Sequence, residues 1–257
     1  MSLQILEEKD KSQYQKAVES LTQSWNWGEF RKTTGVEVLR IGELNNSTLK
    51  SALQIFFHKI PHTNLTVGYL PRPKIINKEI IEYLKKLGKE NKAIYIKVEP
   101  DEIQRTENPT SPLGLRGAGN SLKKSKAILP KHTIFIDLNK SEEELLKAMH
   151  EKTRYNIKVA QREGVKIEEK DDEKSLESFL KILEGTKKRQ GFYSHPSSYF
   201  RKLWKILKGE KMVHLLLAAY RDEPLAGLLL LHFKDKLYYV HGGSSETHRE
   251  KMPNHLL

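Results

Sequence analysis

The chain has 257 residues, of which 37% are apolar, and it carries a formal net charge of +12. This length suffices for one large or two small domains, and the apolar content predicts a folded globule rather than a disordered chain. The absence of cysteine excludes disulfides, thiol catalysis and cysteine-ligated zinc, and the basic balance favours a polyanionic partner: nucleic acid, a phosphorylated metabolite or an anionic membrane surface.

The N-terminal sequence turns charged by Glu7 and has no apolar core of a signal peptide. No run of about 18 apolar residues is present either. We therefore expect a soluble, cytoplasmic protein.

The first part of the chain mixes helical and strand patterns. A short helix is expected within residues 1–20, followed by an aromatic cluster at helical spacing, Trp25-Asn-Trp-Gly-Glu-Phe30. The other predictions are a hairpin of strands 36–41 and 52–57, a rigid turn at 68–73, a helix over 79–87 that ends at Gly88, and a strand over 93–98.

Residues 108–132 are rich in Gly, Pro and Ser and contain no acidic residue. Their basic side chains are Arg116, Lys123, Lys124, Lys126 and Lys131. The composition predicts a basic loop rather than a neutral linker.

A strand over 133–138 is predicted to precede one long helix, which begins at the capping box Ser141-Glu-Glu-Glu144 and ends before Gly164. Its basic stripe consists of Lys147, Arg154, Lys158 and Arg162, and its opposite, apolar stripe of Leu145, Met149, Ile157 and Ala160. An ordinary solvated helix face is the alternative interpretation of the basic stripe.

The remaining elements continue this mixture. We predict strands at 165–168 and 237–241, a hairpin of 213–220 with 225–233, an amphipathic helix around 176–183, a helix with Pro196 in its first position, and a helical first turn at 253–257. The fold class is therefore α+β with two related halves, residues 1–138 and 139–257, although no sequence repeat is visible.

Four motifs resemble those of the Fem family (FemA, FemB and FemX), the aminoacyltransferases that build peptidoglycan interpeptide bridges. They are Ser24-Trp-Asn-Trp-Gly-Glu-Phe-Arg-Lys32; Lys152-Thr-Arg-Tyr-Asn-Ile-Lys158 with Glu163-Gly-Val165; Arg189-Gln-Gly-Phe192 with Pro196-x-x-Tyr-Phe200; and Tyr238-Tyr-Val-His-Gly-Gly-Ser244. They occur in the family's order and spacing, and the resemblance covers essentially the whole chain.

The resemblance implies two GNAT-like (acyl-CoA N-acyltransferase fold) domains, the second incomplete because family members continue further. It also implies transfer of an amino acid from aminoacyl-tRNA to the stem-peptide lysine amine of a peptidoglycan precursor, either UDP-MurNAc-pentapeptide or lipid II. No cofactor is implied. We further expect a monomer with peripheral contact to the inner membrane surface.

By the same resemblance, Arg31 contacts the phosphates of the precursor, and His195, Tyr199 and His241 occupy the other precursor-binding positions. His195 and His241 depart from the Arg and Tyr that family members carry there. Read without the resemblance, Tyr199 is equally a core aromatic and His195 a helix-start residue. The basic stripe is then expected to steer tRNA. No catalytic residue is identified, and no metal site is expected.

Two other functions remain open from the sequence. An acyl-CoA-dependent N-acyltransferase needs a Gln/Arg-x-x-Gly-x-Gly/Ala loop that cradles pyrophosphate, and the nearest candidate, Arg116-Gly-Ala-Gly119, has the wrong spacing and no preceding strand. A non-catalytic protein that binds RNA or a membrane through its basic surface is the second alternative.

Overall fold

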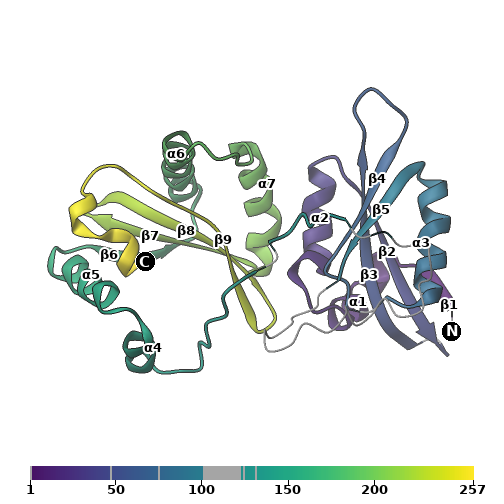
Figure 1. Ribbon diagram of the computed structural model, residues 1–257, viewed down its shortest axis with the longest axis horizontal. Helices are drawn as coiled ribbons and strands as arrows, with labels where there is room; N and C mark the ends of the chain where they lie inside the picture. The colour runs from purple at the N-terminus through teal and green to yellow at the C-terminus, as the bar shows by residue number, and fades with distance from the viewer. Residues whose placement is uncertain (1, 47, 75, 101–122, 124, 131) are drawn as a thin grey trace. The chain divides into compact units, whose positions relative to one another are not determined.

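The computed structural model describes residues 2–46, 48–74, 76–100, 123, 125–130 and 132–257. It divides into two compact units, a first unit of Met1–His132 and a second unit of Thr133–Leu257 (Figure 1). The division lies between residues 132 and 133, whereas the sequence pattern predicts it after Leu138.

The first unit is a five-stranded sheet with helices on both faces (Figure 1). Its elements are β1 (Ser2–Ile5), α1 (Lys11–Ala17), α2 (Trp25–Thr33), β2 (Glu37–Asn45), β3 (Thr48–Lys59), β4 (Thr66–Pro71), α3 (Lys78–Glu90) and β5 (Ala93–Glu99). The strand order is β1-β2-β3-β4-β5, antiparallel except for β4 and β5, which run parallel across α3. The predicted hairpin of 36–41 with 52–57 is confirmed in β2 and β3.

Alternation along the strands divides the core of the first unit between the two faces of the sheet. Ile41, Ile55 and Phe57 point to one face and form a buried cluster with Ile80 and Leu84 of α3. On the other face, Val38 and Phe56 pack with Trp27 of α2. Figure 1 shows α3 on one side of the sheet and α1 and α2 on the other.

A buried cation connects α2 to the sheet of the first unit. The Arg40 side chain is only 4% exposed, and its Nη2 donates to the Trp25 carbonyl (2.9 Å) and to Glu29 Oε1 (2.8 Å). Its guanidinium carbon lies 3.6 Å from the Trp25 ring centroid, which adds a cation–π contact. Gly28 permits this close approach, since a Cβ there would lie 2.5 Å from Arg40 Nη2.

Two predictions in the first unit are wrong because Gly and Pro act here as packing residues. The predicted turn at 68–73 is largely strand β4; Gly68 makes room for Ile96 of β5, and Pro71 is the last residue of β4. The helix predicted to end at Gly88 continues to Glu90. A Cβ on Gly88 would lie 3.1 Å from Ile96, so this glycine lets α3 lie close to β5.

The second unit is a four-stranded antiparallel sheet, also with helices on both faces (Figure 1). Its elements are α4 (Glu142–Ala148), α5 (Glu151–Arg162), β6 (Lys166–Lys170), α6 (Glu173–Gln190), α7 (Ser197–Leu207), β7 (Val213–Tyr220), β8 (Glu223–Phe233), β9 (Lys236–Ser244) and α8 (Pro253–Leu256). The order β6-β7-β8-β9 includes the predicted hairpin of β7 and β8, which is confirmed.

Both units repeat one topology. In each, a strand at the edge of the sheet is followed by two helices and then by a three-stranded antiparallel meander whose first strand pairs with that edge strand. In the first unit the succession is β1, α1, α2 and β2-β3-β4, and in the second it is β6, α6, α7 and β7-β8-β9. The mixed α+β class is therefore confirmed, and the two halves are related in topology.

Three predictions in the second unit are wrong. Residues 133–138 form no strand, because neither sheet pairs with them, and the Ile134 side chain is 88% exposed. Pro196 is the N-cap of α7 rather than its first helical residue. The long basic helix is two helices: Met149 adopts an extended backbone, and His150 caps α5 by accepting from the Lys152 amide (3.2 Å). The capping box at Ser141 is confirmed.

None of the helices in the described ranges combines the length and apolarity that crossing a bilayer requires.

Candidate functional site

Three of the predicted precursor-binding residues meet in the second unit as a cluster of rings. His195 stacks on Tyr199 with ring centroids 3.8 Å apart and planes at 13°. Tyr199 meets Phe200 edge to face at 5.5 Å, and Phe200 meets His241 in the same manner at 4.7 Å. We call His195, Tyr199, Phe200 and His241 the ring cluster.

Each member of the ring cluster is placed by a different local feature. Gly191 adopts a left-handed conformation (φ 68°) that ends α6 and turns the chain toward α7, so that His195 lies just before that helix. Tyr199 and Phe200 lie in the first turn of α7, and His241 lies on β9 opposite Leu229 of β8. Phe200 is 1% exposed and connects α7 to β9.

The two histidines of the ring cluster differ in environment. Burial, together with the nearby positive charge of His195, lowers the pKa of His241 to about 4. His241 is thus neutral near pH 7 and offers one ring N–H donor and one ring nitrogen acceptor. His195 is exposed at the rim of the cluster.

A hydrogen-bonded junction joins α6 to the end of β9. Arg189 Nη2 donates to the Ser244 carbonyl (2.9 Å), and the Ser244 amide donates to Thr186 Oγ1 (3.0 Å). A Cβ on Gly243 would lie 3.0 Å from Thr186 Oγ1, so the strand approaches α6 closely here. The junction holds the strand that carries His241, and it brings two of the sequence motifs together.

Arg31 lies in the first unit, in the last turn of α2. Its guanidinium carbon is 5.8 Å from the ring centroid of Phe56 on β3. Burial and the charge of Arg31 lower the pKa of His58, two residues further along that strand. Next to Phe56 in the sheet, Tyr69 of β4 donates its hydroxyl to Glu99 Oε2 (2.6 Å).

Sequence reasoning missed His58 and Tyr69, which lie near Arg31, and Glu99, which accepts from Tyr69. Burial and the adjacent carboxylate raise the pKa of Tyr69 well above its usual range. Burial alone would raise the pKa of Glu99, but hydrogen bonds from Tyr69 and two backbone amides lower it overall. A usable signal was present: the two-residue period of β3 places Phe56 and His58 on one face of the sheet.

The predicted basic stripe does not lie along one helix. Lys147 belongs to α4, and the other three residues belong to α5. Arg154 is half-buried, and its guanidinium donates to the Met149 carbonyl, where α4 ends. Lys158 and Arg162 are exposed, and Arg162 lies 3.6 Å from Glu163.

The apolar stripe predicted opposite the basic residues is also only partly buried. Met149 is 39% exposed, whereas Ala160 is fully buried and Asn156 nearly so. The break at His150 turns α4 out of the line of α5, so the predicted face does not continue across it.

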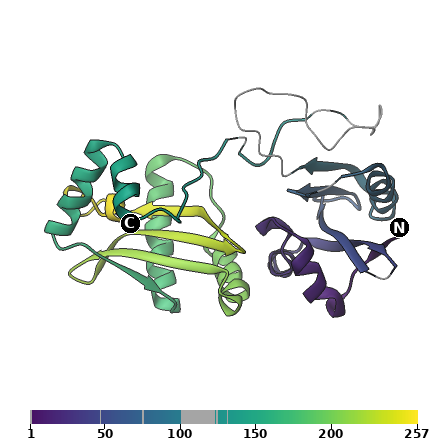
Figure 2. The same ribbon diagram turned by 90° about the horizontal axis from the view of Figure 1, so that it is seen from below.

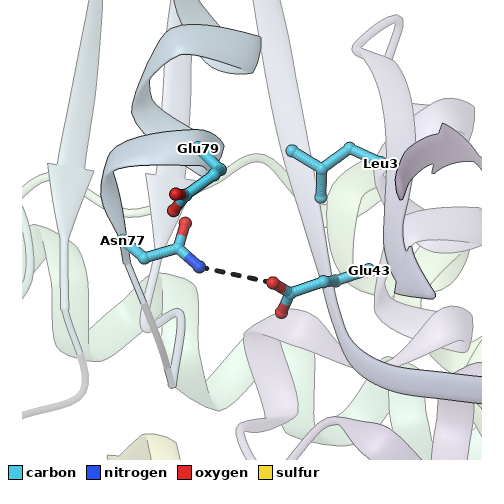
Figure 3. A pocket seen from close by; sticks show the side chains of 4 residues that line it. All are labelled: Leu3, Glu43, Asn77 and Glu79. Carbon is cyan, nitrogen blue, oxygen red and sulfur yellow. Dashed lines mark hydrogen bonds between the residues drawn. The ribbon is translucent and has the colours of Figure 1, made fainter. Parts of the chain in front are cut away.

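Two hollows are lined by none of the predicted site residues. One of about 330 Å³ is lined by Leu3, Glu43, Asn77 and Glu79, with Asn77 Nδ2 donating to Glu43 Oε1 at 3.3 Å (Figure 3). The other, of about 420 Å³, lies between α6 and α7 and includes the bidentate Arg201–Glu177 pair (2.6 and 2.8 Å).

The described ranges contain no group of three or more His, Asp or Glu side chains suited to a metal ion. The candidate coenzyme A loop Arg116–Gly119 and most of the basic segment 108–132 lie outside the described residues.

These features define a mixed α+β chain whose two sheets are covered by helices and whose second sheet carries a cluster of aromatic rings. The sequence matches the FemAB family over residues 6–221, and the chain therefore belongs to that family.

Named relatives and a solved structure agree with this membership. Lipid II:glycine glycyltransferase of Staphylococcus epidermidis is 24% identical over 308 residues, and that of Staphylococcus aureus 25% over 313; each alignment covers 91% of this chain and 74% of the relative. The crystal structure of FemX matches with a TM-score of 0.81 at 22% identity, covering 100% of this chain and 83% of that one. At this identity the structural match shows the fold alone.

Proposed function

We propose that this protein transfers an amino acid from aminoacyl-tRNA to the stem-peptide lysine amine of a peptidoglycan precursor. Membership of the FemAB family supports a transferase of this kind, and the relatives named above are lipid II:glycine glycyltransferases. The observation that carries the proposal is the convergence of His195, Tyr199 and His241 in the ring cluster.

The proposed reaction needs positioning more than covalent catalysis, because the ester of aminoacyl-tRNA is already activated. The neutral lysine amine attacks the ester carbonyl carbon, a C–N bond forms and the C–O bond to the ribose breaks. The amine proton passes to the departing ribose oxygen, so tRNA leaves with a free hydroxyl. The protein has to hold the two substrates together and keep the amine neutral.

Each site residue receives a role that suits its surroundings. Arg31 binds a phosphate of the precursor through its planar guanidinium, which can donate two parallel hydrogen bonds. Neutral His241 hydrogen-bonds a hydroxyl or amide of the precursor, and Tyr199 supplies a hydroxyl beside it. His195, at the exposed rim, contacts phosphate when it is protonated.

We also propose the type of domain, the cations that steer tRNA, and the oligomeric state and location of the protein. The topology repeated in the two units supports two GNAT-like domains. Of the four cations predicted to steer tRNA, Lys147, Lys158 and Arg162 keep that proposed role, whereas the Arg154 guanidinium donates to the Met149 carbonyl. We further propose a monomer that acts in the cytoplasm and touches the inner membrane surface where a lipid-linked precursor is presented.

Binding of UDP-MurNAc-pentapeptide, measured by titration calorimetry, tests the site assignment. Arg31→Ala is expected to weaken affinity about 10- to 150-fold, since hydrogen bonds to charged groups contribute about 1.5–3 kcal/mol. Tyr199→Phe is expected to weaken it several-fold. Exposed Lys59→Ala and Tyr193→Phe are matched controls with affinity near that of the parent. Unchanged affinity in both site variants would refute the assignment.

Transfer of labelled glycine, alanine or serine from charged tRNA to the same precursor tests the reaction. Failure with all three amino acids, together with turnover of acetyl-CoA, would instead identify an acyl-CoA N-acyltransferase.

A further inference from the structure

The outer face of α5 presents an aromatic ring between cations. Tyr155 is 61% exposed, and Lys152 and Lys158 lie three positions before and after it, where side chains on a helix are neighbours. Arg162 is one turn beyond Lys158. All three cations are exposed. We call Lys152, Tyr155, Lys158 and Arg162 together the α5 outer face. The one exposed acid within this stretch of the helix is Glu151, at its first position.

The fold holds this face outward. On the opposite side of α5, Ala160 is packed against Ala218 and Ala226 of the sheet. Asn156 Nδ2 hydrogen-bonds His255 Nε2 of α8 at 3.1 Å, which fixes the rotation of the helix. Figures 1 and 2 show α8, the yellow helix at the C-terminus, beside α5. Tyr155 therefore lies in water because the helix is locked with that side outward.

The structure also changes which residues form the exposed surface. The Arg154 guanidinium donates to the Met149 carbonyl and so caps the end of α4. This bond engages the cation that the sequence pattern assigned to tRNA. Tyr155, the next residue, takes the central position on the exposed side. An alternating cation–aromatic–cation row results, with Lys152 and Lys158 about 9 Å apart along the helix axis at 1.5 Å per residue.

Such a row matches the chemistry of an unpaired RNA strand. Every base has a face that stacks on an exposed aromatic ring, and the phosphates on either side of that base pair with flanking cations. A membrane surface fits less well, because Tyr155 is the only exposed large hydrophobic side chain within α5, and a single ring is not an apolar stripe that could insert between lipids.

We propose that the α5 outer face binds an unpaired stretch of RNA, with Tyr155 stacking on a base and with Lys152 and Lys158 contacting the adjacent phosphates. This inference rests on the proposed function in one respect, namely that the RNA is the aminoacyl-tRNA donor.

Stacking and phosphate contacts are separable by their dependence on salt. The probe is a short, unstructured fluorescent oligoribonucleotide, whose binding to the full chain is followed by anisotropy over a series of salt concentrations. Tyr155→Leu is expected to weaken binding about 5- to 150-fold at each salt concentration without changing the salt slope. Tyr155→Phe keeps the ring and should bind like the parent. Lys158→Ala removes one phosphate contact, so the slope of log affinity against log salt concentration should become less steep by about 0.7.

Matched controls separate this site from a general effect of surface substitutions. Tyr95, on β5 of the first unit, is 56% exposed, and Tyr95→Leu should leave RNA affinity unchanged. Equal losses of RNA affinity in Tyr155→Leu and Tyr95→Leu would overturn the proposal. So would a loss in Tyr155→Leu that is as large for a fully paired RNA as for the unstructured one. Binding to vesicles of phosphatidylglycerol that depends on Tyr155, without binding to RNA, would assign the face to a membrane and overturn the proposal as well.

The aminoacyl-transfer assay distinguishes failure of this inference from failure of the proposed function. If transfer proceeds and Tyr155→Leu leaves both RNA affinity and the KM for charged tRNA unchanged, the stacking site is wrong while the transferase assignment stands. If RNA binding depends on Tyr155 but no amino acid is transferred, the stacking site stands and the donor role fails.

Discussion

His241 shows how a single residue takes its chemistry from its neighbours. Its ring contacts the buried Phe200 edge to face and lies near His195, whose positive charge lowers the pKa of His241. Burial disfavours the charged imidazolium, and a neighbouring cation disfavours it further. The ring therefore stays neutral under conditions in which an exposed histidine would be partly charged.

The depressed pKa of His241 predicts a loss of stability in mild acid. The folded-state pKa is about 4, whereas an unfolded histidine has a pKa of about 6.5, so the unfolded chain binds more protons between these values. The contribution of His241 is fully present above about pH 6.5 and falls as the pH drops toward 4. The parent protein should have a lower urea midpoint at pH 4.5 than at pH 7. In His241→Phe this difference should be smaller, because the titrating ring has been removed.

NMR titration tests the cause of that shift directly. Removing the neighbouring charge in His195→Gln should raise the pKa of His241, whereas the exposed-site control His62→Gln should leave it unchanged. A pKa for His241 near 6.5 in the parent protein would contradict the effect that partial burial and His195 are expected to have on this ring.

Much of the residue-scale picture was accessible from the sequence, but its partners were not. His195, Tyr199 and His241 were predicted as binding residues, and their meeting in one unit is a property of the fold. Phe200, which connects them, was indistinguishable from any apolar residue of an amphipathic helix. Which aromatic of a helix meets which strand depends on contacts between residues far apart in the sequence.

At the scale of elements, α2 depends on Arg40 of β2 for its position. Glu29 Oε1 and the Trp25 carbonyl accept the two hydrogen bonds donated by Arg40 Nη2, and the ring of Trp25 covers the guanidinium. Burial alone would raise the pKa of Glu29, but hydrogen bonds from Lys32 and Arg40 outweigh it and lower the pKa. Because α2 carries Arg31, this contact also positions a candidate site residue.

Arg40→Ala is expected to lower the free energy of unfolding by about 3 kcal/mol, the lower end of the range for breaking a buried ion pair, because Glu29 is partly exposed. The matched control is Lys32→Ala, which removes the other cation on the same carboxylate (2.8 Å) but from an exposed position. Its effect should stay within about 0.5 kcal/mol. Urea unfolding measures both, and similar losses would show that Arg40 acts only as a surface cation.

The break between α4 and α5 shows the limit of pattern reasoning at this scale. The spacing of Lys147 and Arg154 is the same whether or not the helix continues between them. The stop is made by the extended backbone at Met149 and by the His150 side chain, which accepts from the Lys152 amide. Histidine is not among the residues that are usually found at a helix N-cap, so the sequence indicated only weakly that a new helix begins after His150.

At the scale of the whole molecule, Thr133–Leu138 marks the start of the second unit without belonging to either sheet. Its apolar side chains are exposed and its backbone forms no strand, so a protease can bind it in the extended form that cleavage requires. The two sheets, by contrast, have cores of their own.

Brief digestion with chymotrypsin is therefore expected to cut after Phe135 or Leu138 before it cuts at the buried Phe57 or Phe179. Mass spectrometry of the first fragments checks this order. Phe135→Ser combined with Leu138→Ser should slow the first cut without changing the urea midpoint. Early cleavage inside either sheet would contradict two independently packed units.

The sequence by itself determined the α+β class, the hairpins β2–β3 and β7–β8, the capping box of α4 and the resemblance to the Fem family. Apolar periodicity and capping residues are local signals, and in these elements they were enough to specify the local structure. Only the tertiary structure decided that residues 133–138 stay unpaired, that Gly68 and Gly88 lie within elements and make room for Ile96, and that Tyr155 is exposed while the Arg154 guanidinium bonds the Met149 carbonyl. Those outcomes depend on which distant segments supply hydrogen bonds and van der Waals contacts, and a local pattern carries no information about them.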